Sequence, residues 1–180
     1  MALDPIIVGV ADCVVVSDPG QVLATYALGS CIGLALHDPA SGLGGILHFM
    51  LPDSALDPSR ARERPFMFAD TGIRILVAEV CARGASPRRL AAHAAGGARI
   101  MDQNGEFAIG ERNCLALRRI LWKQGILLRG VAIGGAQSRT MRLEIGSGRV
   151  WIDEAGVRHE LTGAAWGKGT VYGVSPADRR

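Results

Sequence analysis

Apolar residues in the first fifty positions fall into short runs separated by turn-forming residues. Runs of about four to eight such residues, bounded by Gly, Pro, Asp or Ser, are typical of β-strands. Pro52 ends the last run, and a stretch rich in Gly, Pro and Asp at 37–45 predicts a loop. The expected strands, which together suggest an antiparallel meander, cover residues 6–10, 13–16, 21–28, 31–36 and 46–51.

The spacing of apolar residues changes after a polar stretch at residues 53–65, for which we expect a solvated loop. Positions three and four apart then become apolar, which is typical of a helix. The residues that set this spacing are Ile73, Leu76, Val77, Val80 and Cys81. We expect Asp70 or Thr71 to cap the start of the helix, and Gly84 to lie at its C-terminal cap.

The same helical spacing returns once, in residues 111–125, and each helix pattern is followed by an apolar strand pattern. A hairpin is expected to close the series around the Gly-Ser-Gly turn at 146–148. Because helix and then strand occur twice, the chain predicts a mixed sheet covered by helices, in the α/β (α+β) class.

Composition limits the choice of protein class. The 180 residues are 48% hydrophobic, enough for one core, and their net charge is only +3. We expect one domain at residues 1–155 and a tail at 156–180 that packs loosely or moves. The small, dispersed charge does not favour nucleic-acid binding. No apolar run approaches the ~20 residues of a membrane helix, and the N-terminus does not resemble a signal peptide, so a reduced, cytoplasmic protein is expected.

A thiol and an imidazole are expected to meet in the hairpin of residues 31–51. If its loop centre lies near residue 40 or 41, His48 pairs near Gly33, and Cys31 pairs near Met50. Cys31 and His48 then share one face as diagonal neighbours ~7–8 Å apart. An imidazolium beside a thiol lowers the thiol pKa, and the pair can perform nucleophilic catalysis.

Several features bear on whether this pair is catalytic. Gly29 and Ser30 leave access to the cysteine, and a catalytic histidine needs a third group that orients it. A lone Cys or His in an apolar strand is nevertheless most often a packed core residue, so the residues alone leave both interpretations open. The remaining histidines are weaker candidates, with His37 expected in the solvated loop, His93 in a strand and His159 in the tail.

Six segments in order resemble the CheD family of chemoreceptor glutamine deamidases, over about residues 6–152. They are "TYALGSCIGLALHDP", "GGILHFMLP", "FADTGIRIL", "AAGGA", "IGERN" and "IGGAQSRTM". The resemblance implies Cys31 as nucleophile, His48 as general base and acid, and Thr25 as the group that orients His48. It also implies a layered α/β sandwich like the catalytic domain of the cytotoxic necrotizing factor toxins.

The resemblance further implies a reaction without metal or organic cofactor. Selected glutamines on the cytoplasmic helices of chemoreceptors would be hydrolysed to glutamate through a cysteine thioester, with release of ammonia. It implies a monomer, and many family members bind a CheC-type phosphatase. One alternative is a docking module that binds receptors or such a phosphatase without catalysis. Another is transamidation, in which an amine intercepts the thioester.

Overall fold

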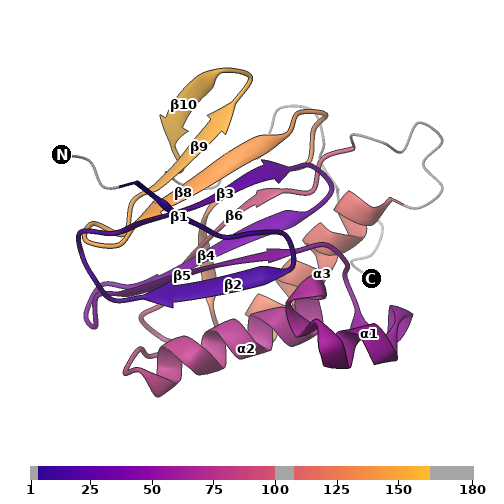
Figure 1. The fold of residues 1–180 in the computed structure, drawn as a ribbon, viewed down its shortest axis with the longest axis horizontal. Coiled ribbons are helices and arrows are strands. Elements are labelled where there is room, and N and C mark those ends of the chain that lie inside the picture. The colour runs from indigo at the N-terminus through magenta and orange to yellow at the C-terminus, as the bar shows by residue number, and fades with distance from the viewer. Residues whose placement is uncertain (1–3, 100–107, 163–180) are drawn as a thin grey trace, which may run out of the picture.

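Two five-stranded β-sheets pack face to face, and helices cover the outer face of one of them (Figure 1). The structure is a computed structural model that describes residues 4–99 and 108–162. The central sheet lies between the other sheet and the helices, and its strand order is β2 (Asp12–Val16), β5 (Leu43–Phe49), β4 (Ile32–Asp38), β6 (Ala91–Gly96), β7 (Leu127–Ile133). The outer sheet has the order β1 (Ile6–Ile7), β3 (Val22–Leu28), β8 (Arg139–Glu144), β9 (Val150–Glu154), β10 (Val157–Glu160).

Both sheets are mixed. In the outer sheet β1 pairs with β3 in parallel, and in the central sheet β6 pairs with β7 in parallel, while the remaining pairs are antiparallel. The helices are α1 (Pro58–Glu63), α2 (Ala69–Ala82) and α3 (Ile109–Lys123), with short 3-10 turns at Ser54–Leu56 and Pro65–Met67. The predicted mixed α+β architecture is therefore confirmed.

The central sheet carries the core on both of its faces, and all residues of β4 and β5 are buried. One cluster joins the sheet to the helices through side chains such as Leu34, Leu47 and Leu117. The other joins the two sheets through Ala35, Ile46 and their neighbours. Burial on both faces explains why these strands read as continuous apolar runs rather than as alternating ones.

Two predictions about the first strands are wrong in part. The hairpin of β4 and β5 forms as expected, but β3 lies in the other sheet, so the three strands make no single meander. The predicted loop at 37–45 shrinks to a tight turn, because β4 continues to Asp38 and β5 begins at Leu43. His37 is buried rather than solvated, and its Nε2 lies 2.9 Å from the carbonyl oxygen of Ile145.

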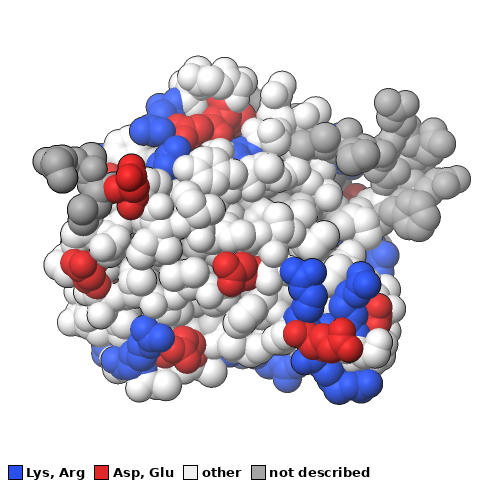
Figure 2. All heavy atoms as spheres, in the orientation of Figure 1, with Lys and Arg blue, Asp and Glu red and all other residues white. Residues whose placement is uncertain are grey.

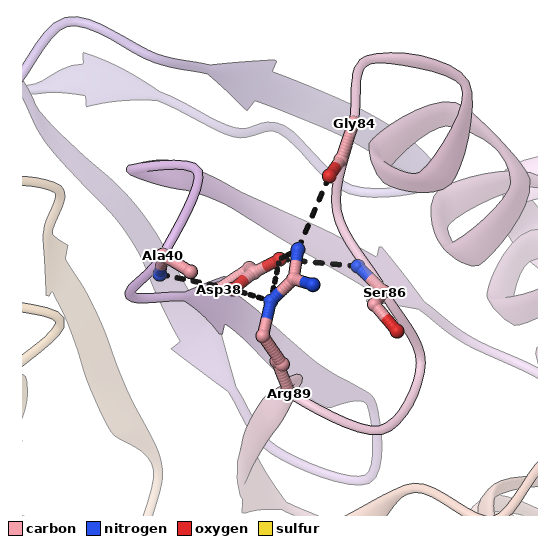
Figure 3. A network of polar contacts seen from close by, with 5 residues as sticks. All are labelled: Asp38, Ala40, Gly84, Ser86 and Arg89. Carbon is pink, nitrogen blue, oxygen red and sulfur yellow. Dashed lines mark hydrogen bonds and ion pairs between the residues drawn. The ribbon is translucent and has the colours of Figure 1, made fainter.

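Asp38, the last residue of β4, lies at the centre of a network of polar contacts (Figure 3). Its side chain is fully buried, and it accepts hydrogen bonds from the Arg89 guanidinium, with Nη2 at 2.6 Å from Oδ2. The backbone N–H groups of Ala40 and Ser86 also donate to it, at 3.0 and 3.1 Å. This network ties the β4–β5 turn to the connection between α2 and β6.

The start of α2 also differs from the prediction. The helix begins at Ala69 after Phe68, without a side-chain cap. Asp70 instead accepts hydrogen bonds from the backbone and hydroxyl of Ser54, and the Thr71 hydroxyl donates to the carbonyl of Pro65. The predicted end is confirmed, since Gly84 has φ +108° and donates its N–H to the carbonyl of Cys81.

Charged side chains gather in clusters of both signs on the face seen in Figure 2, over α1 and near β9 and β10. The segment predicted as a solvated loop contains α1, where Arg60 lies near Asp57. Within the predicted tail, β10 pairs antiparallel with β9, and His159 lies on β10. The rest of the tail, residues 163–180, lies outside the described residues, and the boundary at residue 155 stays a prediction.

Candidate active site

The β4–β5 hairpin brings His48 close to the segment that carries Cys31. Gly33 pairs with His48 and Ile32 pairs with Phe49, so the predicted register is confirmed. Cys31 lies in a bend directly before β4, two residues from Gly33. His48 is buried, whereas Cys31 is partly exposed.

Thr25 reaches His48 from the other sheet. It lies on β3, is fully buried, and has its hydroxyl oxygen 2.8 Å from His48 Nδ1. The same hydroxyl donates to the carbonyl oxygen of Val8 at 2.8 Å. A hydroxyl has one hydrogen, so towards His48 the Thr25 oxygen acts as an acceptor. His48 must therefore carry its proton on Nδ1.

This proton position leaves a lone pair on His48 Nε2. In the part of the chain that the structure describes, this buried nitrogen has no hydrogen-bond partner. It is therefore an unoccupied proton acceptor on the strand that pairs with β4, directly opposite Gly33. Thr25 thus sets the tautomer as well as the orientation of the ring, which a hydrogen bond to one ring nitrogen generally does.

The approach of Thr25 depends on Gly33. A Cβ atom at Gly33 would lie 3.2 Å from Thr25 Cγ2 and 2.9 Å from Leu28 Cδ1, both tighter than ordinary contacts. Gly33 and the Val8 carbonyl are functional features that the sequence analysis missed. The glycine gave one signal, because a glycine inside a strand often marks a close approach of neighbouring groups.

Burial keeps both candidate groups neutral. It lowers the pKa of His48 to about 4, because the charged imidazolium loses its contact with water. Burial also raises the pKa of the Cys31 thiol, while the backbone N–H of Cys31 itself acts in the opposite direction. The structure thus differs from the expected thiolate beside an imidazolium, because the partner of His48 is an uncharged hydroxyl.

The segment that carries Cys31 is held by hydrogen bonds to its carbonyl groups. The N–H of Gly97 donates to the carbonyl of Cys31 and that of Ala98 to the carbonyl of Gly29, both at 2.8 Å. Gly96 has φ +111°, and a Cβ there would overlap the Cys31 carbonyl oxygen. The turn that follows β6 therefore packs directly against the backbone of Cys31.

Within residues 4–99 and 108–162, no three His, Cys, Asp or Glu side chains come together in a way that could hold a metal ion. In the same ranges, no helix is both long enough and apolar enough to span a membrane.

Comparison with known proteins identifies the family. The family described as "CheD chemotactic sensory transduction" matches residues 50–154. A relative from Solibacter usitatus is 65% identical over 88% of this chain and 94% of its own length. The chain belongs to the CheD family. The resemblance found from the sequence motifs is therefore confirmed.

The relatives of this CheD-family chain carry similar names. The Solibacter protein is called a probable chemoreceptor glutamine deamidase. So are proteins from Syntrophus aciditrophicus, 43% identical over 84% of this chain, and Anaeromyxobacter dehalogenans, 46% identical over 81%. The family match begins at residue 50, after the three candidate residues. The Solibacter alignment covers 159 of the 180 residues, so it must begin before Thr25 and it includes all three positions.

Proposed function

We propose that this protein is a glutamine deamidase that hydrolyses selected glutamine side chains of chemoreceptors to glutamate. The observation that carries the proposal is the chain of hydrogen bonds from Val8 through Thr25 to His48, which leaves Nε2 as a free base two residues in register from Cys31. The names of the relatives support the substrate class. Cys31 is the nucleophile, His48 the general base and acid, and Thr25 the residue that orients His48.

The reaction begins from a neutral thiol and a neutral imidazole. His48 Nε2 takes the proton from the Cys31 thiol as sulfur attacks the carboxamide carbon of the substrate glutamine. The tetrahedral intermediate then expels ammonia, which leaves with the proton from Nε2–H. A thioester between Cys31 and the substrate remains, and His48 is again neutral.

Hydrolysis of the thioester completes the cycle. His48 Nε2 takes a proton from a water molecule, and the hydroxide attacks the thioester carbon. The carbon–sulfur bond breaks, the product glutamate is released, and the proton on Nε2 returns to the Cys31 sulfur. The sum is one glutamine and one water converted to one glutamate and one ammonia, with no metal or organic cofactor in any step.

The finer features that the family resemblance implies belong to the same proposal. We take the fold to be related to the catalytic domain of the cytotoxic necrotizing factor toxins, with the catalytic unit in residues 1–155. The substrate glutamines lie on cytoplasmic helices of the receptor. The protein acts as a monomer, and a CheC-type phosphatase binds near the site. The mixed charge clusters of Figure 2 are consistent with a protein substrate rather than nucleic acid.

Intact-mass analysis of a chemoreceptor cytoplasmic fragment tests the proposal. Each deamidation adds about one mass unit, because an amide NH₂ is replaced by OH. The increase is expected with the wild-type protein and with Cys81→Ala, a partly buried cysteine on α2 that serves as control. It is absent with Cys31→Ala and His48→Ala. Retained activity in Cys31→Ala would refute the proposal, and incorporation of an added primary amine would reveal transamidation.

A further inference from the structure

Asn113 is a fully buried amide on the inner side of α3. Its neighbours on this side, Cys114 and Leu117, belong to the apolar core between the central sheet and the helices. Within the described residues, the Asn113 side-chain oxygen is buried without a hydrogen-bond partner. An amide with an unsatisfied buried oxygen costs stability in an otherwise apolar environment. Stability of the core therefore does not explain why an asparagine occupies position 113.

Both N–H groups of the Asn113 side chain point at the candidate site. Nδ2 donates to the carbonyl oxygen of Ser30 at 2.9 Å and to that of Met50 at 2.8 Å. Ser30 directly precedes Cys31, and Met50 follows His48 by two residues. One side chain thus joins the segment that carries the thiol to the end of the strand that carries the imidazole.

The bond to Ser30 also fixes a peptide plane. The described residues contain no cis peptide bond, so the carbonyl of Ser30 and the N–H of Cys31 point in opposite directions. With the carbonyl held toward α3, the N–H of Cys31 must point away from α3. This is the amide that opposes the effect of burial on its own thiol. An N–H in that position can stabilise negative charge that forms on sulfur or on an adjacent oxygen.

We infer that Asn113 is a positioning residue, which holds the Ser30–Cys31 peptide so that its N–H faces the reacting atoms, and which fixes Cys31 relative to His48. The inference deepens the proposed deamidase function and rests on it. Asn113 touches neither substrate nor the reacting atoms, and it acts through the backbone of Ser30 and Met50.

Three variants separate positioning from general stability. Asn113→Leu keeps the approximate shape without hydrogen-bond donors or acceptors, and Asn113→Ala removes the amide group. Leu117→Ala weakens the packing of the same helix one turn away and leaves both bonds of Asn113 intact, so it is the matched control. The melting temperature of each is measured, and activity is compared at a temperature at which all are folded.

We expect kcat for deamidation to fall about a hundredfold in both Asn113 variants, with KM within about threefold, because small misplacements of reacting groups cost about that much. Leu117→Ala keeps kcat within about threefold of the wild type. Equal loss of kcat in Leu117→Ala and the Asn113 variants would overturn the inference.

A second readout needs no receptor. Cys31 alkylation by iodoacetamide is followed against pH by peptide mapping, which separates it from the other cysteines. The midpoint moves to higher pH in the Asn113 variants, and alkylation below it is roughly tenfold slower, as expected when a hydrogen bond to a thiolate is lost. Simple loosening would raise the plateau rate without moving the midpoint. An unmoved midpoint in a folded Asn113→Leu protein would overturn the inference, even if the wild type proved not to be a deamidase. If Asn113→Leu does not fold, the midpoint in Asn113→Ala decides the question.

Discussion

Replacing Thr25 by valine removes one hydroxyl group and keeps the shape of the side chain. Two buried groups lose their partner, since the Thr25 oxygen joins the Val8 carbonyl to His48 Nδ1. Each unsatisfied group costs about 1–3 kcal/mol. Neither ring nitrogen of His48 then has a partner, so the proton is no longer held on Nδ1 and can shift to Nε2, and for the two groups together we expect the free energy of unfolding to fall by about 2–6 kcal/mol.

That proton shift would also remove the base. With the hydrogen on Nε2, His48 can no longer accept the thiol proton, and general-base catalysis is worth about 10²–10⁴ in rate. We expect kcat for deamidation to fall within this range in Thr25→Val. Thr25→Ser keeps the hydroxyl, so it should retain most activity and serves as the control.

The assay combines three measurements on the two variants. Urea unfolding gives the change in stability, mass analysis of a receptor fragment gives kcat, and ¹⁵N chemical shifts of the imidazole show which nitrogen carries the proton. If Thr25→Val kept kcat within about threefold of the wild type, or kept the proton on Nδ1, the proposed role of the hydroxyl would be refuted.

Three further predictions concern pH, stability and packing. Activity should stay level from neutral pH down to about 5 and fall only as His48 is protonated near its pKa of about 4. A midpoint near the ordinary histidine pKa of ~6.5 in the pH profile of kcat/KM would contradict this. Asp38→Asn should lower the free energy of unfolding by about 2 kcal/mol at pH 7, because a charged hydrogen bond to partly exposed Arg89 is lost. Arg89 holds the pKa of Asp38 below its usual range, so that stabilisation is present above pH ~4 and declines in more acidic solution. Urea unfolding at pH 7 and pH 3 tests this. If the wild type and Asp38→Asn differed in free energy of unfolding by the same amount at both pH values, the interpretation would be wrong. Gly33→Ala should cost about 1–3 kcal/mol and reduce kcat, because the new methyl group presses on Thr25. Gly9→Ala is the comparison, since a Cβ there meets only Asp12 at an ordinary distance of 3.9 Å. An unchanged kcat in Gly33→Ala would be inconsistent with the close approach.

The sequence was a good guide wherever the deciding contacts are local. The register of β4 and β5 follows from a short hairpin, so the predicted pairing of Gly33 with His48 is confirmed. Residues 22–28 have a strand pattern that fits either sheet, and only long-range pairing with β8 places them in the outer sheet. His37 was misjudged because its partner, the Ile145 carbonyl, lies 108 residues further along the chain.

The residues of the candidate site also differ in how far the sequence alone predicts them. The hairpin pattern alone predicts that Cys31 and His48 lie close together, whereas Thr25 is indicated only by the family resemblance. Its role in setting the tautomer could not be predicted, since it depends on the Val8 carbonyl, which reaches the Thr25 hydroxyl through tertiary packing. Asn113 was missed because a polar residue on a helix gives no sign of which backbone carbonyls it will meet.

The uncharged hydroxyl that hydrogen-bonds to His48 has a consequence for how readily the Cys31 thiol is oxidised. Peroxides and other electrophiles attack thiolates far faster than thiols. Burial favours the protonated form of Cys31, and the group that hydrogen-bonds to His48 is an uncharged hydroxyl. The resting protein therefore holds its reactive sulfur in the form that resists oxidation to sulfenic acid. If Cys31 is the nucleophile, as proposed above, this form preserves it between encounters with a substrate.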